Sequence, residues 1–499
     1  MSMAQELEAL KGEIQLSEQE LKDFVFQSAQ QGKAIHEVEE GLWDRLLALG
    51  HRHLGAFLAL HGDGDLGETI TLPDGQPCQR LEEKHERRYV SIFGAFHLER
   101  AVYGSRKGQK IEFVPLDNRL QLPARPFSYV LQDWDQSLCV EEAFKQASGT
   151  VARILRLKQS VDSLERMNVQ MAEHVTEFRE NRPMPAAETE GELLVLSGDG
   201  KGVVLRRDEP APAGHRSKGE KASQKRMAVV GTAYTVDRYW RTAEQVVAAL
   251  FGELEKRPER PEPQNKHVWA SLGFEDDKGV LHHGSEAVYP WLLNEVAERN
   301  RGFAKEMVVL HDGEETLWAA RDRHLPHKNS TDILDFLHVT PRLWKAAHAF
   351  HPEGSDEAEL LVRQLMLRIL HGGVAGVIRG LREMATKRGL PASKKKTITQ
   401  VCGYFKSNQE RMRYHDYLAK GYPIATGVIE GACRHLVKDR MERAGMHWRL
   451  EGAQAMLDMR STYINGDWEA YNAFRIDKET ARLYPHRELV EGEHYALAV

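Results

Sequence analysis

Three acidic residues lie in local contexts that suit chemistry on a phosphodiester. Asp199 lies between two glycines after an apolar run, Asp312 follows a second apolar run, and Glu430 lies near an expected helix start. Three carboxylates that converge repel each other, so their pKa values rise unless cations neutralise them. Two divalent ions about 3.5–4 Å apart do this, and they also hold the attacking and leaving oxygens of a phosphodiester. Mg²⁺ or Mn²⁺ fits an all-carboxylate site that retains water, so we expect two such ions at these three acids.

The context of Asp199 has two interpretations. Residues 193–196 form an unbroken apolar run, which indicates a buried strand, and a second apolar run covers 203–205. The flanking glycines leave the carboxylate with little side-chain cover, which suits a hard metal ion that also binds water and phosphate. A Gly-Asp-Gly hairpin turn is the alternative, because both residue types are common in turns.

Other polar residues accompany the three acids. Asp335 and His338 bracket the end of a short strand expected over residues 331–339. His338 could orient a carboxylate or contact a phosphate, and a buried structural histidine is the alternative. A solvated helix face is the alternative for Lys438. The candidate contacts to DNA phosphate are Lys201, Arg434, His435, Lys438, Arg166, Lys394 and Lys395.

The elements around Asp199 form the opening of an RNase H-like sheet, with the acid on the first of three consecutive strands. A later strand places Asp312 at its carboxyl end, where functional groups gather in parallel sheets. The expected elements are strands at residues 193–196, 203–205, 227–236 and 305–310 and helices at about 241–257 and 285–300.

A helical block separates Asp335 from Glu430. A helix is expected at about residues 341–350, and residues 355–420 are almost wholly helical in pattern. We interpret this block as an insertion in an α/β catalytic core. Thr426 is expected to cap the helix that carries Glu430.

The chain before residue 182 is mainly helical in pattern. A capping box at residues 17–20 predicts a helix start, and helical apolar spacing continues to about His61. Two strand-like runs, 88–93 and 96–103, flank Gly94-Ala95, which predicts a β-hairpin.

Residues 127–180 predict two or three helices. A break near 157–159 leads to Ser160, which suits the N-cap of a helix through Val175. Helix, short turn and capped helix form the outline of a helix-turn-helix, with Arg166 on the exposed face of the second helix. Plain helical packing explains the same pattern equally well.

Composition bounds the class of protein. The chain has 499 residues, 41% hydrophobic and 28% charged, which is ordinary for a soluble globular protein of two to four domains. The net charge of −6 excludes a protein coated in basic residues but not local binding of nucleic acid. Four scattered cysteines show neither a disulfide framework nor a zinc ribbon, and no signal peptide is visible, so the cytosol is expected.

Four stretches, which contain the three acids and the pair Asp335 and His338, resemble ISKra-type insertion-sequence transposases. The resemblance covers roughly residues 190–462 and is weaker over 86–180. The stretches are residues 197–203, 312–313, 335–338 and 426–441.

The resemblance implies a DDE transposase with an RNase H-like core and Asp199, Asp312 and Glu430 as its catalytic triad. It implies that Asp335 and His338 match an Asp-x-x-His element near the active site. It also implies double-stranded DNA as partner, both transposon ends and target, a homodimer or larger assembly, and the bacterial cytosol. Relatives often carry cysteine pairs after the hairpin, but residues 104–108 contain none here, so no zinc is expected.

Two other functions are compatible with these patterns. One is a catalytically inactive DNA-binding or assembly protein derived from a transposase, and the other is an RNase H-like nuclease without strand transfer. The expected division is an N-terminal helical region at 1–75, a hairpin and helix-turn-helix-like region at 76–181, a linker at 182–190, core at 191–345, helical insertion at 346–420, core at 421–463 and a tail at 464–499.

Overall fold

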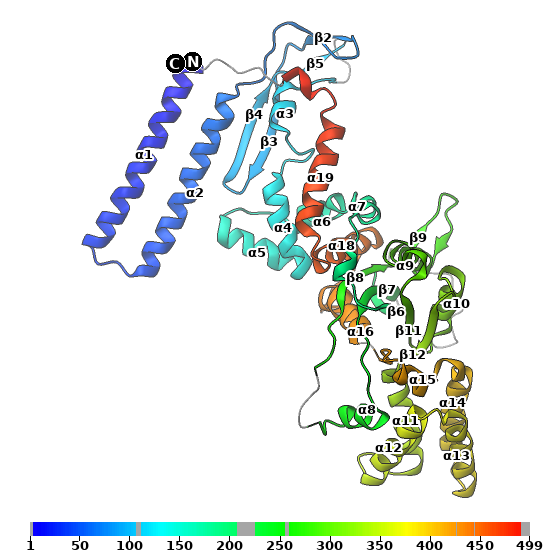
Figure 1. Cartoon of the computed structure of the whole chain (residues 1–499). Coiled ribbons are helices and arrows are strands. Elements are labelled where there is room, and N and C mark those ends of the chain that lie inside the picture. The colour runs from blue at the N-terminus through cyan, green and yellow to red at the C-terminus, as the bar shows by residue number, and fades with distance from the viewer. Residues whose placement is uncertain are drawn as a thin grey trace. The chain divides into compact units, whose positions relative to one another are not determined.

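The computed structural model describes residues 3–105, 111–206, 225–254, 259–425, 427–443 and 445–490, with the backbone alone for residues 3–7. The chain folds into two compact units (Figure 1). Unit 1 combines residues 1–174 with residues 468–499, and unit 2 comprises residues 175–467. The expected cap Thr426 and residues 106–108 lie outside the described ranges. Within those ranges, no helix is long and apolar enough to span a membrane.

Unit 1 is mainly helical and contains two small antiparallel sheets. One sheet has the order β1-β2-β5, and the other is the hairpin β3-β4. Its strands are β1 (Thr69–Thr71), β2 (Pro77–Arg80), β3 (His85–Ser91), β4 (Gly94–Arg100) and β5 (Tyr103–Gly104). Its helices are α1 (Met3–Gln30), α2 (Ile35–Leu60), α3 (Pro115–Leu120), α4 (Tyr129–Glu141), α5 (Phe144–Leu155), α6 (Val161–Met171) and α19 (Trp468–Leu483).

Two predicted boundaries in unit 1 are wrong. The capping box at residues 17–20 lies inside α1, where the Ser17 hydroxyl donates to the Glu13 carbonyl at 2.9 Å, because strong helix formers precede it. The predicted hairpin is confirmed, but Ser91 pairs with Gly94, so the turn lies at residues 92–93 and not at Gly94-Ala95. The Ser91 hydroxyl accepts the Phe93 N–H at 3.1 Å and closes this turn.

The helix-turn-helix outline of α5 and α6 is confirmed as a local arrangement. Arg156 ends α5 in the left-handed region at φ 57°, and the Ser160 side chain caps α6 by accepting the Ser163 N–H at 3.1 Å. Helix α6 ends at Met171 rather than at Val175. Helix α4 packs on both helices, so three helices form this bundle.

The C-terminal helix α19 belongs to unit 1, an association that the sequence did not indicate. The Trp468 indole N–H donates to Asp133 Oδ1 on α4 at 2.6 Å, and the Arg475 guanidinium donates to Gln132 Oε1 at 2.9 Å. These contacts tie the last helix to the helix that precedes the helix-turn-helix outline.

Unit 2 is built on a five-stranded mixed sheet with the order β12-β11-β6-β7-β8. β6 pairs antiparallel with β7 and parallel with β11, and β12 is parallel to β11. β8, which follows the Pro-rich segment, was not predicted because its first four residues are polar. The strands are β6 (Leu193–Val204), β7 (Lys225–Val236), β8 (Gln264–Ser271), β11 (Glu306–His311) and β12 (Ser330–Leu334).

The turn interpretation of Asp199 is wrong. The two short strands expected on either side of it are one strand, β6, which pairs with β7 along its whole length and places Asp199 opposite Val230. The glycines at 198 and 200 therefore lie in extended backbone. Their lack of a side chain allows neighbouring side chains to pack closely and does not serve a turn.

Helices cover both faces of the sheet, and alternate strand residues enter separate cores. Leu193, Val195 and Val308 join the core that contains α8 and the helical block, whereas Leu194 and Val309 join the core with α9 and α10. The predicted helical block at 355–420 is confirmed, and it shares its core with the sheet. The helices are α8 (Ala243–Leu250), α9 (Ser285–Arg299), α10 (Glu315–His324), α11 (Phe336–Phe350), α12 (Asp356–Leu370), α13 (Val374–Lys387), α14 (Ala392–Ser407), α15 (Tyr414–Ala419) and α18 (Leu450–Ile464).

The strand expected over 331–339 is shorter than predicted. β12 ends at Leu334, and α11 begins at Phe336 instead of at Pro341. The cause is Asp335, whose carboxylate accepts the Leu337 N–H at 2.7 Å and caps the helix. His338 therefore lies in the first turn of a helix and not at a strand end.

The segment expected to be a linker, 182–190, is anchored to unit 2. Arg182 is buried and forms ion pairs with Glu295 at 2.7 Å and with Asp467 at 2.9 Å. Glu190 pairs with Arg299 at 2.8 Å. Most of this stretch is therefore part of the folded unit.

Candidate active site

Asp199 lies in the middle of β6, half-buried, with its side chain flanked by glycines. A Cβ atom at residue 200 would come within 3.0 Å of Met227 Cε, and one at residue 198 would come within 3.1 Å of Tyr289 Oη. The glycines thus allow neighbouring side chains to pack closely while the carboxylate stays accessible. The Gly200 N–H donates to Asp199 Oδ1 at 2.7 Å.

A buried histidine supports β6 beside Asp199. The Gly198 N–H donates to His311 Nδ1 at 3.0 Å, and His311 Nε2 lies 3.0 Å from Tyr289 Oη. Burial lowers the pKa of His311 to about 3, so the ring is neutral, and its Nε2–H must donate to the tyrosine oxygen. Sequence reasoning missed His311, whose only signal was its place before Asp312.

Asp312 follows β11 and reaches the same edge as Asp199. β11 runs parallel to β6 with Leu310 opposite Ser197. Asp312 and Asp199 each lie two residues further along, so the two acids are neighbours across the two strands. Asp312 Oδ1 accepts the Glu314 N–H at 2.8 Å, which fixes one oxygen. Burial raises the pKa of Asp312, and the negative charge of Asp199 adds to this, whereas His338 and Arg342 oppose it.

Glu430 lies on the short helix α16 (Gly427–Ala432), which packs against β6 and β7. The helix continues into a wider π-helical turn, η4 (Cys433–Lys438), and then into α17 (Asp439–Met441). The Cys433 thiol, one turn after Glu430 and therefore on the same face, donates to Asp199 Oδ2 at 3.3 Å. This contact joins the helix of the third acid to the strand of the first.

Both carboxylate oxygens of Glu430 are buried. Neither makes a hydrogen bond to any residue that the structure describes. Its ion-pair partner is His338, whose Nε2 lies 3.5 Å from Oε1. Glu430 raises the pKa of His338, burial lowers it, and Asp335 and Asp312 raise it further. The Glu430 side chain as a whole is 37% exposed, and His338 is its one cationic neighbour in the described part of the chain, so its carboxylate has room for a further positive charge and fits a divalent metal ion.

The structure brings the predicted acids to one region but not into one tight cage. Among the described residues, Asp199, Asp312 and Glu430 do not form a group whose oxygens all lie within 4.8 Å of one another. His338 bridges this region through Glu430, and Asp335 caps its helix. Asp199 lies on β6, Asp312 directly follows β11, and Glu430 lies on α16.

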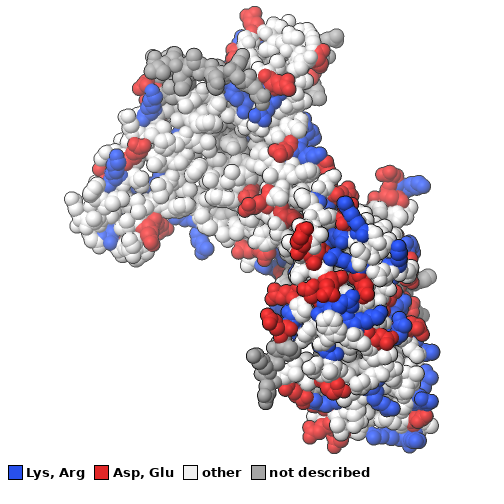
Figure 2. Space-filling view, viewed as in Figure 1, with Lys and Arg blue, Asp and Glu red and all other residues white. Residues whose placement is uncertain are grey.

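Most candidate DNA contacts are engaged in ion pairs. Lys201 pairs with Glu442 at 3.6 Å, and Arg434 and His435 both approach Asp439, at 3.7 and 3.1 Å. Arg166, in unit 1, pairs with Asp162 at 2.5 Å. Three others are exposed: Lys438, Lys394 and Lys395. On the visible face in Figure 2, acidic and basic side chains are interspersed, so phosphate contacts require local clusters.

A cavity of about 450 Å³ adjoins Asp312 and His338. Its other walls include Arg342 and Lys345 on α11 and Tyr404 on α14. Sequence reasoning did not select these three residues. The signal available was the spacing of His338, Arg342 and Lys345, which places them on one helix face.

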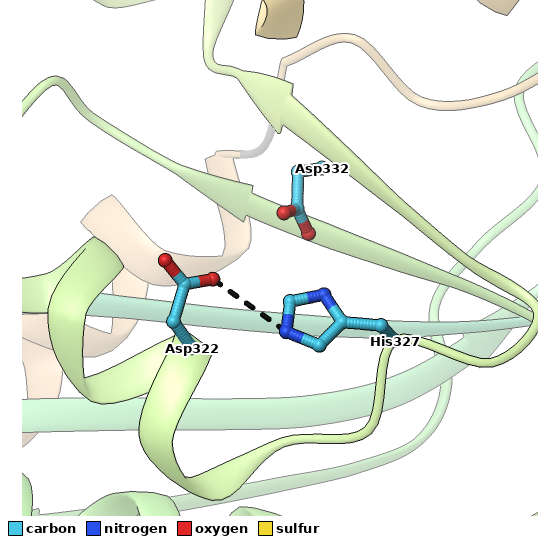
Figure 3. A group of neighbouring side chains, drawn as sticks. All are labelled: Asp322, His327 and Asp332. Carbon is cyan, nitrogen blue, oxygen red and sulfur yellow. Dashed lines mark ion pairs between the residues drawn. The ribbon is translucent and has the colours of Figure 1, made fainter.

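A second group of polar residues includes Asp332 of β12 (Figure 3). The ligand atoms of Asp322 on α10, His327 and Asp332 lie within 4.8 Å of one another. However, the buried Arg321 guanidinium donates to Asp332 at 2.7 Å and to His327 Nε2 at 3.1 Å. This cation already neutralises the group, so we interpret it as an ion network rather than as a metal site.

No protein-family model matches the sequence. No curated protein matches it either. Among solved structures, the chain is similar to the Drosophila P element transposase strand transfer complex, with 10% sequence identity, coverage of 75% of this chain and 88% of that chain, and a TM-score of 0.24. A score this low assigns neither a fold nor a function to this chain.

Proposed function

We propose that this chain is a DNA transposase that cuts at transposon ends and joins them to target DNA through a DDE site. The observation that carries the proposal is the arrangement of three acids. Asp199 in β6 and Asp312 directly after β11 occupy neighbouring positions along two parallel strands. Glu430 lies on a helix packed against β6, with both oxygens buried and without a hydrogen bond from any described residue.

The sheet supports an RNase H-like core. Its first strand, β6, is central, the next two strands follow antiparallel on one side, and the last two lie parallel on the other. The resemblance to ISKra-type transposases implies a sheet that opens in this way, with the first acid on the first strand. The helical block between β12 and Glu430 corresponds to the insertion that the resemblance implies.

Asp199, Asp312 and Glu430 would hold Mg²⁺ or Mn²⁺, which supplies activation of a water or 3′-hydroxyl and charge neutralisation at the leaving oxygen. The chain's own residues set the geometry. Cys433 fixes one oxygen of Asp199, and the Glu314 N–H fixes one oxygen of Asp312. His338, with its Nε2 3.5 Å from Glu430 Oε1, would orient the Glu430 carboxylate.

The partner under this proposal is double-stranded DNA, both at transposon ends and at the target. Because such an enzyme must hold two ends, we propose a homodimer or a larger assembly. Under this proposal Lys201 and Arg434 would contact DNA phosphate; in the structure Lys201 pairs with Glu442 and Arg434 with Asp439.

The decisive experiment compares Asp199→Asn with Asp322→Asn. Both remove one carboxylate charge and keep the side-chain shape, but Asp322 lies in the Arg321 network. With DNA carrying the sequences that flank the gene, in the presence of Mg²⁺, we expect Asp199→Asn to lose cleavage by about 10³-fold or more and Asp322→Asn to keep it. Cleavage at the wild-type rate by Asp199→Asn would refute the assignment. Cleavage without joined product would indicate a nuclease instead of a transposase.

A further inference from the structure

The cavity beside Asp312 has walls of opposite character. The acids Asp312 and Glu314 follow β11, and the cations Arg342 and Lys345 lie on α11. Its volume of about 450 Å³ falls within the range of small-molecule sites, large enough for one nucleotide. Asp312 belongs to the proposed catalytic site, whereas Glu314 and the two cations are not among the residues proposed to hold a metal ion.

Arg342 and Lys345 are exposed cations without ion pairs. Neither forms a salt bridge with any residue in the described part of the chain. His338, Arg342 and Lys345 are spaced at intervals of four and three residues, so they lie on one face of α11, each about one helical turn beyond the last. Two unpaired cations on a cavity wall favour an anionic ligand, and the distance of one to two turns from His338 separates that anion from the metal-binding acids.

Tyr404 completes the cavity from the helical insertion. A Cβ atom at residue 313 would lie 2.2 Å from Tyr404 Cε2, so Gly313 is required for the ring to approach the strand end. Arg342 lies over the same ring, with its guanidinium carbon 4.5 Å from the centroid. Burial raises the pKa of Tyr404 to about 12, so its hydroxyl stays protonated. The ring offers an apolar face next to the two cations.

We infer that this cavity binds the nucleotide next to the phosphodiester that is cut. Its phosphate lies on Arg342 and Lys345, and its sugar or base packs against Tyr404. The inference rests on the proposed function, because it assigns the neighbouring phosphodiester to the three acids. The inference also assigns a role to the helical insertion, because Tyr404 of α14 forms the wall that would position the DNA strand relative to the three acids.

Salt-dependent DNA binding tests the two cations. The probe is a fluorescein-labelled 20-base-pair duplex with a single-stranded 3′ extension, titrated in EDTA over a series of NaCl concentrations. We expect Arg342→Gln and Lys345→Gln each to reduce the slope of log K against log salt by about 1, because each removes one phosphate contact. Arg379→Gln, an exposed charge change on α13, is the matched control and is expected to keep the wild-type slope.

A substitution in the wall tests the packing of the nucleotide. Tyr404→Ala is expected to weaken binding of the same probe on the order of 10-fold without changing the slope, because stacking is independent of salt. Lys345→Gln removes an exposed side chain and keeps the fold, so it decides the question if another variant unfolds. Wild-type slopes for both Gln variants would overturn the inference.

The outcomes separate this inference from the proposed function. If the slopes fall while the wild-type protein neither cuts nor joins DNA in Mg²⁺, the nucleotide site stands and the catalytic assignment fails. If cleavage depends on Asp199 while the slopes of both Gln variants equal that of Arg379→Gln, the catalytic assignment stands and the nucleotide site fails.

Discussion

His311 shows how a residue without a recognisable motif can hold a functional strand. It accepts the Gly198 N–H on one side and donates to Tyr289 on the other, in a region without water access. A hydrophobic side chain there would leave a buried N–H without an acceptor, which costs about 1–3 kcal/mol. The local sequence predicted Asp312, because the acid follows an apolar run, but it could not predict a contact that depends on strand register.

We expect His311→Phe to lower the free energy of unfolding by about 1–3 kcal/mol and to reduce cleavage, because β6 loses its support next to Asp199. His311→Gln should lose less than half as much, since an amide can accept the Gly198 N–H and donate to Tyr289. Urea denaturation of the two variants measures the difference. Equal losses would show that the volume of the ring matters and its hydrogen bonds do not.

At the scale of elements, strongly periodic segments were predictable and context-dependent ones were not. The run before Asp312 is apolar throughout, so β11 was predicted nearly to the residue. The start of α11 was not predicted correctly. Only one residue, Asp335, separates β12 from α11, and its carboxylate caps the helix. β8 was missed, since its half-polar sequence becomes a strand only through pairing with β7.

The helix that precedes the helix-turn-helix outline, α4, contains a buried acid, Asp135. Gln159 Nε2 donates to both of its oxygens, at 2.9 and 2.7 Å. Burial raises the pKa of Asp135 to about 7, and the contact with Gln159 opposes this only partly. The folded state therefore binds the proton more tightly than the unfolded state, so this residue stabilises the fold at low pH and the contribution is lost as pH rises from about 4 to about 7.

We expect Asp135→Asn to remove this pH dependence and to stabilise α4–α6 at pH 8 by about 2–4 kcal/mol, an order-of-magnitude figure. The amide can also donate to Gln159 Oε1, which has no hydrogen-bond partner among the described residues. Hydrogen exchange of backbone amides in α4 and α6 between pH 5 and 8 measures the effect. Asp162→Asn, an exposed change on α6, is the control, and an equal response in both variants would contradict the prediction.

At the scale of the whole molecule, the chain leaves unit 1 near residue 174 and returns to it at residue 468. A sequence read in order suggested a linker and a tail at these places. What it could not show is that Arg182, after the first crossing, forms an ion pair with Asp467, just before the second. Contacts between residues this far apart in the sequence carry no local pattern.

Arg182 also belongs to a buried network of ion pairs in unit 2, close in sequence to the boundary at residue 175 and paired with Asp467 at the boundary before residue 468. Glu295 is its centre, with Arg182 at 2.7 Å, His267 at 2.8 Å and Arg299 at 3.3 Å. Burial alone would raise the pKa of Glu295, but the hydrogen bond and charge of His267 and the charges of the two arginines lower it to about 2. The carboxylate therefore contributes stability above its unfolded-state pKa of about 4.5, and this contribution is lost as pH falls towards 2.

We expect Glu295→Gln to lower the free energy of unfolding of unit 2 by about 3–5 kcal/mol at pH 7, because it leaves two buried arginines without their shared acid. Glu298→Gln, an exposed change three residues along α9, should cost less than about 0.5 kcal/mol. Urea denaturation of the full chain at pH 7, 4 and 3 measures this effect. The difference in unfolding free energy between the two variants should shrink as pH falls below about 4.5, because Glu295 then becomes protonated in the unfolded chain but stays ionised in the folded chain. A difference that stays constant down to pH 3 would mean that packing around residue 295, and not its charge, closes unit 2.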